Sequence, residues 1–340
     1  MTTGILEQDI CDFSARFKLT QELKGKHFAI TGATGLLGSC MVRCLLGLDS
    51  AYALGIAITC VVRDIEKAKS MFGSAVNLLE HDFAVDGTLA LPDSVDYIVH
   101  FASPTASKFF VGNPVETIYT GFLGTRQVLE TAARINSKVV YVSSLEVYGA
   151  IYDDSKPVTE DVMGDIDPMA TRSSYPMVKR MSECLCKAFA SEKGLHVTVA
   201  RLAQTFGAGV AQDDNRVFAQ FARSVVKDED IVLHTKGELS RCYCYTTDAI
   251  EGMLYILLRG KDGEAYNVSN DGTYISVFDM AKLVCESFNP HVKTVIRLQE
   301  GMGYSPVTKL RLSSAKLQSL GWSPNYGLEE MYHRLIESFR

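Results

Sequence analysis

The sequence predicts an α/β protein with a doubly wound parallel sheet and a smaller, mixed α/β C-terminal domain. Two observations carry this prediction. Between residues 26 and 201, short apolar runs alternate with helical patterns, which is typical of a parallel sheet that helices cover on both faces. The first apolar run also opens directly into a glycine motif and a helix, an arrangement typical of dinucleotide-binding sheets.

The apolar runs give the order of the expected elements. Strands are expected at residues 26–31, 56–62, 76–79, 95–101, 138–143 and 196–201, with one helix reaching about residue 48 and another at 115–136. A short amphipathic helical segment, residues 1–24, precedes the first strand. After Leu202 helices are expected at 216–227, 249–259, 277–288 and 328–339, with short strands within 230–247 and at 265–268 and 293–298. Because the regular alternation of strands and helices ends at about Leu202, the sequence predicts a second, smaller domain that is interleaved with the first.

Composition and charge exclude several classes of protein. The chain has 340 residues, a net charge of −6 and 47% hydrophobic residues. This is ordinary globular usage, and it argues against a nucleic-acid binder with a broad basic face. No apolar run reaches the ~18 residues that a membrane span needs, and the acidic N-terminus does not resemble a secretory signal. We therefore expect no nucleic-acid partner, no membrane partner and a cytoplasmic location.

The cysteines indicate reduced thiols rather than a metal site. The chain has nine cysteines and no CxxC pair. Cys184 and Cys186 fall in a helical pattern, where positions i and i+2 point apart. Reduced thiols in a cytoplasmic protein are the simpler interpretation, and no metal site is expected.

The glycine motif Gly32-x-x-Gly35-x-x-Gly38 carries the first functional prediction. It lies between a predicted strand and a predicted helix, and this context makes the spacing informative. Glycine allows a tight turn and the close approach of a pyrophosphate to the helix N-terminus, whose free N–H groups favour anions. We expect a Rossmann domain that binds a nicotinamide dinucleotide. The residues assigned to this cofactor are Gly32, Thr34, Gly35, Leu36, Leu37 and Gly38.

Residues at the ends of the next strands complete the expected cofactor site. Arg63 stands where an acidic residue usually contacts the ribose hydroxyls of NAD, and its guanidinium suits the 2′-phosphate of NADP. Asp64 follows directly, so NAD is the first expectation and NADP stays open because of Arg63. Asp82 is placed to meet the adenine amino group. The same site is expected to include Phe83, Ala102 and Ser103.

The motif Tyr175-x-x-x-Lys179 predicts a catalytic pair. At positions i and i+4 of a helix the two side chains share a face, and a nearby ammonium lowers the pKa of a phenol. Tyr175 is therefore a candidate acid/base near neutral pH. Ser144, at the end of a predicted strand, adds a hydroxyl that can hold a substrate hydroxyl or keto oxygen while hydride moves.

With these motifs in place, the chain resembles the extended short-chain dehydrogenase/reductase family over about residues 23–339. The resemblance rests on TGATGLLG, HFASP, YVSSLEVYG, YPMVK, ARLAQTFG and RCYCYTTD, in this order. It implies an NAD-dependent enzyme whose usual substrates are nucleotide-diphosphate sugars. It also implies that Tyr175 is the acid/base, that Lys179 binds the nicotinamide ribose, and that Ser144 binds the reacting hydroxyl.

Within that family, several stretches are similar to UDP-glucuronate decarboxylases. In such enzymes C4 of the sugar is oxidised, the β-keto acid loses carbon dioxide, and the hydride then returns. Glu146 belongs to that pattern and to that of the 4,6-dehydratases, in which it is the base. Leu145 departs from both patterns, because dehydratases have an acid there and decarboxylases usually a serine. Decarboxylase and 4-epimerase chemistry are expected about equally, and the alternatives are a 4,6-dehydratase, an NADPH-dependent reductase of a small carbonyl compound, or a non-catalytic NAD(P)-binding protein.

Cationic and polar side chains are expected to hold the substrate. Arg241 matches the family arginine that binds phosphate, and Arg216 is a second candidate, since guanidinium geometry suits bidentate contact. Gln204 stands where the family has an asparagine that touches the pyrophosphate, and Gly121 also replaces a family asparagine. The expected substrate site further includes Ser103, Lys108, Ser144 and Tyr304.

The resemblance also implies a domain division and an assembly. Residues 1–202 and 244–270 are expected to form the NAD(P)-binding domain, and residues 203–243 and 271–340 the nucleotide-sugar-binding domain. A homodimer is expected through the helices predicted at 115–136 and 175–193, the second of which is apolar on more than one face.

Overall fold

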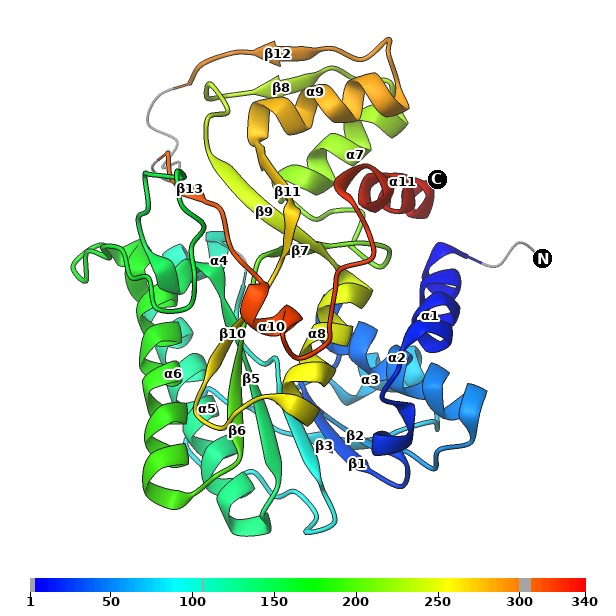
Figure 1. The fold of residues 1–340 in the computed structure, drawn as a ribbon, viewed down its shortest axis with the longest axis vertical. Helices are drawn as coiled ribbons and strands as arrows, with labels where there is room; N and C mark the ends of the chain where they lie inside the picture. Colours follow the sequence, from blue (N-terminus) through cyan, green and yellow to red (C-terminus); the bar gives the residue numbers. More distant parts are fainter. Residues whose placement is uncertain (1–3, 106, 300–306) are drawn as a thin grey trace.

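A parallel sheet of seven strands forms the centre of the molecule (Figure 1). The computed structural model describes residues 4–105, 107–299 and 307–340. The strand order is β10-β6-β5-β4-β1-β2-β3, and every neighbouring pair is parallel. The strands are β1 (His27–Thr31), β2 (Ala57–Val62), β3 (Asn77–Glu80), β4 (Tyr97–His100), β5 (Lys138–Ser144), β6 (Val197–Leu202) and β10 (Ala265–Val268). The predicted doubly wound α/β sheet is confirmed.

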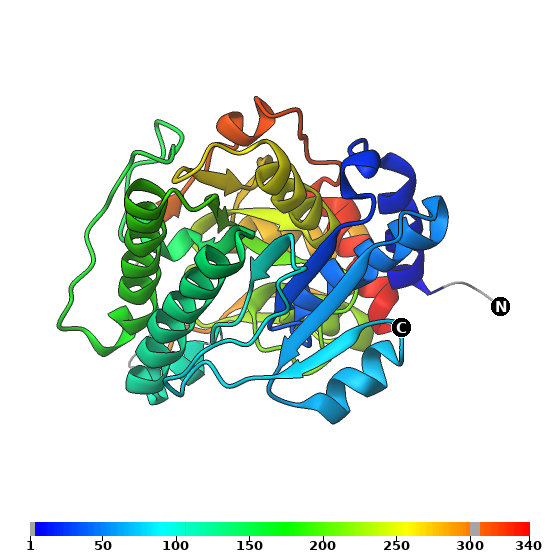
Figure 2. The ribbon, with the colours of Figure 1, turned by 90° about the horizontal axis from the view of Figure 1, so that it is seen from below.

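Helices cover both faces of this sheet, as the view from below shows (Figure 2). One face carries α2 (Leu36–Tyr52), α3 (Ile65–Phe72) and α8 (Thr246–Arg259), and the other carries α5 (Pro114–Ile135) and α6 (Ser174–Lys193). Neighbouring strand residues point to opposite faces, so Ile30 packs with the first group of helices and Ala29 with the second. Because both faces are covered, the strands are apolar almost throughout.

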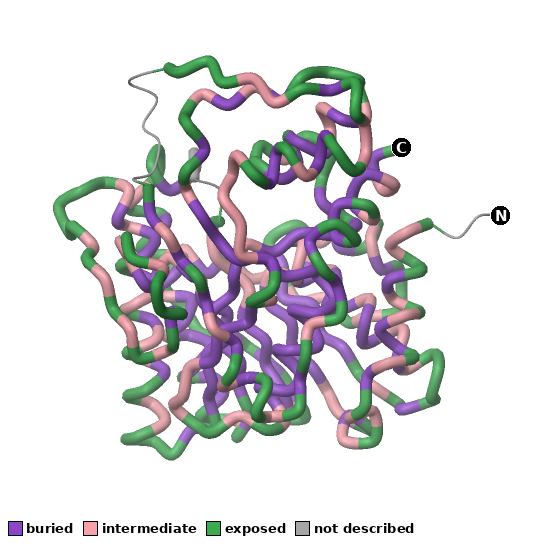
Figure 3. Tube along the Cα trace, turned by 45° about the horizontal axis from the view of Figure 1, so that its top comes forward, coloured by how far each residue is buried: buried purple, intermediate pink, exposed green. Residues whose placement is uncertain are grey.

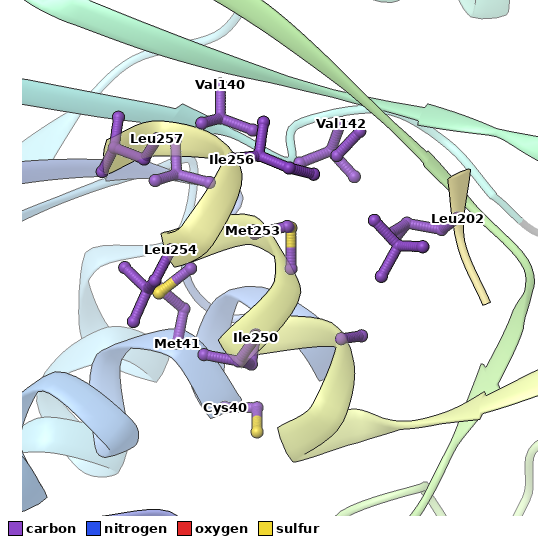
Figure 4. Close-up of a cluster of buried hydrophobic side chains, with 14 of the residues drawn as sticks. Cys40, Met41, Val140, Val142, Leu202, Ile250, Met253, Leu254, Ile256 and Leu257 are labelled. Atoms are coloured by element: carbon purple, nitrogen blue, oxygen red, sulfur yellow. The ribbon is translucent and has the colours of Figure 1, made fainter. Parts of the chain in front are cut away.

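The core between the sheet and the first helix layer is centred on α8 (Figure 4). Met253 and Ile256 of α8 are fully buried in the same cluster as Met41 of α2 and Val140 of β5. Buried residues concentrate around the sheet in the burial view (Figure 3). A fully buried aliphatic side chain stabilises a fold by about 1.5–3 kcal/mol. The buried side chains of this layer therefore hold the sheet in place, and with it the ends of its strands.

The second unit lies above the carboxyl ends of the strands in Figure 1. Its strands are β7 (Gln204–Phe206), β9 (Ser240–Tyr245), β11 (Asn270–Ser276) and β13 (Lys309–Leu310) in one sheet, with β8 (Ile231–Leu233) and β12 (Thr294–Ile296) in another. Its helices are α7 (Val217–Lys227), α9 (Val277–Phe288) and α11 (Leu328–Phe339). The strands β7, β11 and β13 were not expected, because β7 and β13 are short, because β11 pairs with β9 through a register shift, and because all three pair with residues far away in the sequence. The predicted domain division stays a prediction; its boundary at residue 244 falls inside β9.

The remaining elements are short or terminal. Helix α1 (Ile5–Arg16) and the 3₁₀ turn η1 (Thr20–Leu23) precede β1, where a helical segment was expected. The others are α4 (Ser107–Gly112), η2 (Leu145–Tyr148), η3 (Thr171–Ser173) and α10 (Ala315–Gln318). Among the residues that the structure describes, no helix has the length and apolarity to cross a membrane.

The glycine turn gives a test of the packing at the start of α2. A Cβ atom at Gly38 would lie 2.3 Å from the carbonyl oxygen of Gly32, so we expect Gly38→Ala to lower the free energy of unfolding by about 1–3 kcal/mol. Gly35→Ala is the matched control, since its Cβ would lie 3.3 Å from that oxygen and its φ of −81° suits alanine. Urea unfolding of both variants checks this. Equal stability of the two variants would contradict the packing argument.

Candidate active site

The turn between β1 and α2 forms a cradle of backbone atoms. Gly32 has a φ of +64°, and a Cβ there would lie 3.0 Å from the backbone nitrogen of Ala102. Gly35 is the N-cap of α2 and supplies no side-chain cap, so the first N–H groups of the helix lack a side-chain acceptor. Such a helix end favours a phosphate group. The residues present therefore fit a dinucleotide, as the glycine motif predicts.

The side chains of this turn divide between the two parts of the molecule. Leu37 packs against the core of the large sheet, and Leu36 packs against the core of the second unit. Thr34 is half-buried, and the backbone N–H of Ala102 donates to Thr31 Oγ1 over 3.1 Å. The cradle thus lies where the two units meet.

The ends of β2 and β3 hold the next predicted cofactor residues. The carboxylate of Asp64 caps α3, because it accepts a hydrogen bond from the Lys67 backbone over 2.9 Å. Arg63 is exposed beside it. The carboxylate of Asp82 accepts from the Ala84 backbone over 3.0 Å. Phe83 is buried against His100, so a cofactor can meet its backbone but not its ring.

Ser103 follows β4 and presents an unused polar group. Its hydroxyl is buried and has no hydrogen-bond partner among the residues that the structure describes. A buried hydroxyl without a partner costs free energy, so a ligand group that bonds it would be stabilised there. This observation fits the predicted role of Ser103.

One face of α6 holds the end of strand β5 through three side chains spaced by four residues. The Tyr175 phenol lies close enough to the Ser144 hydroxyl for that hydroxyl to lower its pKa. The Lys179 ammonium donates to the carbonyl oxygen of Val142 over 2.8 Å. Glu183 accepts from the Ser143 hydroxyl over 2.5 Å. We call Tyr175, Lys179 and Glu183 the α6 catalytic face; the sequence predicted its first two members and missed the third.

Burial governs the pKa of Tyr175. The phenol is 6% exposed and its ring stacks on Phe110, with ring centroids 5.0 Å apart. Burial raises the pKa of Tyr175, and the Ser144 hydroxyl lowers it by less. The net shift is upward because desolvation is the larger effect, and the lowering of this pKa by Lys179 stays a prediction. In the structure described, Tyr175 is a neutral phenol that can donate a hydrogen bond or a proton, and it can take up a proton only as the phenolate.

Lys179 is buried among aromatic faces. Its ammonium lies 4.9 Å from the ring centroid of Tyr141 and 5.7 Å from that of Tyr175. Burial lowers the pKa of Lys179 to about 8, while the carboxylate of Glu183 acts in the opposite direction. Its charge also contributes to lowering the pKa of buried His100 to about 3. The ammonium is therefore the principal form at neutral pH, and it titrates just above it.

Glu183 is fixed by a buried ion pair with Arg201 of β6. Two guanidinium nitrogens of Arg201 contact the carboxylate, the closer one at 2.7 Å, and the side chains are 6% and 12% exposed. Arg201 also donates to the Tyr148 hydroxyl over 3.1 Å. A cavity of about 610 Å³ opens beside this pair, at the β6–β10 edge and apart from the glycine cradle. One more step of four residues after Lys179 was the sequence signal for Glu183.

Glu146 forms an ion pair with an arginine that the sequence did not single out. Arg172 reaches the Glu146 carboxylate over 3.2 Å, and both side chains are half-buried. The guanidinium of Arg172 also lies over the ring of Phe110, 5.5 Å from its centroid, on the ring that stacks on Tyr175. Leu145 is 2% exposed and belongs to the main core. The position that is an acid in dehydratases is therefore part of the apolar interior.

Arg241 lies close enough to interact with this ion pair. It is 9% exposed, and it donates to the Thr308 carbonyl oxygen over 2.8 Å. Burial lowers the pKa of Arg241, Glu146 raises it and Arg172 lowers it. Two guanidinium groups thus interact with the one carboxylate of Glu146, so positive charge exceeds negative charge in this cluster.

The other predicted substrate residues differ in their surroundings, and not all of them belong to the described part of the chain. Arg216 is the N-cap residue of α7, and its guanidinium is paired with Asp214 over 2.6 Å, so an anion would have to compete with that carboxylate. Gln204 is half-buried in β7, opposite Tyr243 of β9. Lys108 is in α4, but its side chain is not described, and Tyr304 lies outside the described residues.

A known protein family matches the sequence of this chain. The sequence model of the NAD dependent epimerase/dehydratase family matches residues 28–269, more than half of the chain. The chain belongs to this family. This confirms the predicted resemblance, and with it the expectation that the chain is an enzyme of the extended short-chain dehydrogenase/reductase type.

Individual relatives cover nearly the whole chain. UDP-glucuronic acid decarboxylase 3 of Arabidopsis thaliana is 30% identical over 313 residues, which are 92% of this chain and 88% of the relative. The structure is similar to that of UDP-glucuronic acid 4-epimerase from Bacillus cereus in complex with UDP-glucuronic acid and NAD, with a TM-score of 0.76, 19% identity and coverage of 92% and 98%. It is also similar to dTDP-glucose 4,6-dehydratase from Bacillus anthracis in complex with NAD, with a TM-score of 0.72, 17% identity and coverage of 92% and 96%. These structural likenesses show the fold, and the three chemistries differ within it.

The α6 catalytic face predicts a pH effect. Glu183 raises the pKa of Lys179, so Glu183→Gln lowers it, and the ammonium is lost at lower pH. The alkaline limb of kcat should therefore move to lower pH, and activity at pH 9 relative to pH 7 should fall about three- to tenfold further than in the wild type. The measurement is a pH–rate profile.

A matched variant separates charge from structure. Glu183→Asp keeps the negative charge and should restore the position of the limb, although its shorter side chain weakens the contact with Ser143. A profile of Glu183→Gln that is scaled down but unshifted would mean that Glu183 acts only through packing.

Proposed function

We propose that the protein is an NAD-dependent enzyme that modifies a nucleotide-diphosphate sugar through a transient 4-keto intermediate. The observation that carries this proposal is the placement of Ser144, Tyr175 and Lys179 at the end of β5, beside the glycine cradle. The glycine cradle would hold NAD, and the bound cofactor would supply the hydride acceptor for C4 of the sugar and afterwards the hydride donor. The dinucleotide-binding turn and the acid/base pair belong to one sheet edge, where such a transfer requires them.

The side chains supply the proton chemistry of this reaction. Tyr175 takes the proton of the C4 hydroxyl as the hydride leaves, and gives it back when the keto oxygen is reduced. Ser144 orients that oxygen by a hydrogen bond. Lys179, as an ammonium, stabilises the phenolate form of Tyr175 that must be present before the first step and that forms again after the second. Each role follows from a contact of the α6 catalytic face with the end of β5.

Among the possible outcomes we favour decarboxylation of UDP-glucuronate. A 4-keto sugar acid loses carbon dioxide readily, because the enolate is delocalised onto the keto oxygen. Arg172 and Arg241 around Glu146 provide the positive charge that a substrate with a carboxylate and a diphosphate requires. Similarity to UDP-glucuronic acid decarboxylases over most of the chain supports this choice. The burial of Leu145 speaks against dehydration, which requires an acid at that position.

The products of candidate substrates decide among these reactions. Purified protein is incubated with UDP-glucuronate and with UDP-glucose, and the products are examined by mass spectrometry. We expect loss of carbon dioxide from UDP-glucuronate. Loss of water would indicate a dehydratase, and unchanged mass with altered chromatography an epimerase. Steady consumption of added NADPH would instead support the reductase alternative. The exposed Arg63 is the reason for considering that alternative. No bound nicotinamide and no turnover would contradict the proposal.

Tyr175→Phe tests the catalytic assignment. The variant removes only the phenolic hydroxyl, so turnover should fall about 10²–10⁴-fold, the usual contribution of a general acid/base, with cofactor binding retained. Product formation and a fluorescence titration with NADH measure the two properties. Unchanged turnover would revive the alternative of a non-catalytic binding protein.

We further propose a homodimer through α5 and α6. The two helices pack side by side, and they expose apolar side chains: Val115, Ile118, Tyr119, Met177 and Met181. Of these, Val115 is 60% and Met181 55% exposed. An apolar surface of this kind on adjacent helices is typical of an interaction site.

Light scattering tests the dimer. The wild type should have twice the chain mass of 37.4 kDa, and Ile118→Asp should shift it toward the monomer at micromolar concentration, because a buried, unpaired charge is costly. Met169→Asp is the control, since Met169 is 88% exposed and lies outside both helices. A wild type with the mass of one chain would refute a stable dimer.

We also propose a reducing, cytoplasmic location. All nine cysteines are free, including the exposed Cys11 and Cys184, and free thiols are typical of reducing compartments.

A further inference from the structure

Helix α1 precedes the residues that match the family and bridges the two units of the molecule. It contacts α2 and α8 of the large sheet and α11 of the second unit (Figure 1). Its packing on α2 is close: a Cβ at Gly47 would lie 2.5 Å from Cγ2 of Ile10. The family match begins at residue 28, so this helix lies outside the residues that the family model covers.

Arg16 fixes the end of α1 to the large sheet. Its guanidinium contacts Glu251 over 2.9 Å and Asp248 over 3.1 Å, both on α8. It also donates to the hydroxyl of Tyr326 over 3.0 Å. These contacts hold the C-terminal end of α1 against the layer that supports the cofactor turn.

Asp9 fixes the middle of α1 to the second unit. The side chain is 1% exposed. One carboxylate oxygen accepts from the Tyr245 hydroxyl over 2.5 Å, and the other from Arg334 of α11 over 2.6 Å. Both partners are needed, because a buried carboxylate without them would be costly.

Tyr245 passes this contact on to the segment that follows β7, residues 207–216, which we call the 207–216 loop. The Tyr245 hydroxyl accepts a hydrogen bond from the Ala208 backbone over 3.2 Å. A Cβ at Gly207 would lie 2.7 Å from the Tyr245 ring, so the loop begins pressed onto that ring. Asp9, Tyr245 and Ala208 thus form a continuous chain of hydrogen bonds from α1 to the loop.

The 207–216 loop lies between the cofactor turn and the predicted nucleotide contacts. The Cβ position of Gly209 is 3.8 Å from Leu36, in the first turn of α2, and 3.8 Å from Leu6 of α1. At its other end the loop reaches Arg216 at the start of α7. The loop is therefore held between the first turn of α2, which follows the glycine cradle, and Arg216, a predicted diphosphate contact.

We propose that Asp9 is a positioning residue for the nucleotide part of the substrate, acting through Tyr245 on the 207–216 loop. This inference rests on the proposed function, because the loop is useful only if a nucleotide diphosphate binds beside it. Helix α1 then sets substrate affinity without touching the substrate, and it does so by fixing the loop against the start of α2.

Tyr245→Phe tests the proposal with a single atom removed. Loss of the hydroxyl breaks the bonds to both Asp9 and Ala208, so the Kd of UDP and the KM of the nucleotide sugar should rise about three- to tenfold, the value of a hydrogen bond of ordinary strength, with a smaller change in kcat. Tyr332→Phe is the matched control. Its hydroxyl is also buried, and it has no hydrogen-bond partner among the described residues, so its removal should leave Kd and kcat unchanged.

A second variant and a double variant test the chain of bonds itself. Asp9→Asn should also raise the Kd of UDP, and the double variant Asp9→Asn/Tyr245→Phe should cost no more than the larger single effect, because both act on one path. Additive effects would overturn the proposal, as would a Kd in Tyr245→Phe equal to that of the wild type.

Hydrogen exchange distinguishes failure of this inference from failure of the proposed function. Amides of the 207–216 loop should exchange faster in Tyr245→Phe than in the wild type or in Tyr332→Phe, measured without any ligand. Unchanged exchange overturns the inference whatever the enzyme does. If the wild type binds neither UDP nor a nucleotide sugar, the proposed function fails, and the role of Asp9 in substrate binding fails with it.

Discussion

The contact between helix α6 and the end of strand β5 is the interaction on which the rest of the site depends. Three side chains spaced by one helical turn meet a serine hydroxyl, a backbone carbonyl and a second serine hydroxyl of one strand. A helix presents such side chains on one line, and a strand end presents its groups at the sheet edge. Their match determines where an acid/base can stand relative to the glycine cradle two strands away. Burial of the contact then determines the charge states of its members.

The charge of the site is opposite in sign to the net charge of the whole chain. The net charge is −6, yet the site contains Lys179, Arg172 and Arg241, with Glu146 and Glu183 as the neighbouring carboxylates. Elsewhere carboxylates neutralise the arginines, as Asp214 does for Arg216 and Asp9 for Arg334. A local positive region that is not cancelled by its neighbours is what an anionic substrate can use, because a charge already paired offers less to a ligand.

The sequence was informative wherever the determining contacts are local. The strand–turn–helix context of the glycine motif and the spacing of Tyr175 and Lys179 involve residues close together in the chain, and the predicted strands of the large sheet lie where the structure has them. Strands β7, β11 and β13 were missed, because their pairing with β9 depends on residues far away in the sequence. Arg172 was missed for the same reason, since its partner Glu146 is distant in sequence; Glu183 was missed although its spacing of four residues from Lys179 was a local signal.

The sequence by itself thus determined the class of fold, the family and the chemical groups of the site, since these follow from periodicity and from motifs with a physical reason for each residue. Tertiary structure alone decided how those groups are used. It showed that Asp64 caps a helix, that Leu145 belongs to the core, and that burial raises the pKa of Tyr175 against the expected direction. It also showed α1 bonded to both units through Asp9 and Arg16. Desolvation and ion pairing depend on every element packed around a group, so no local pattern contains them.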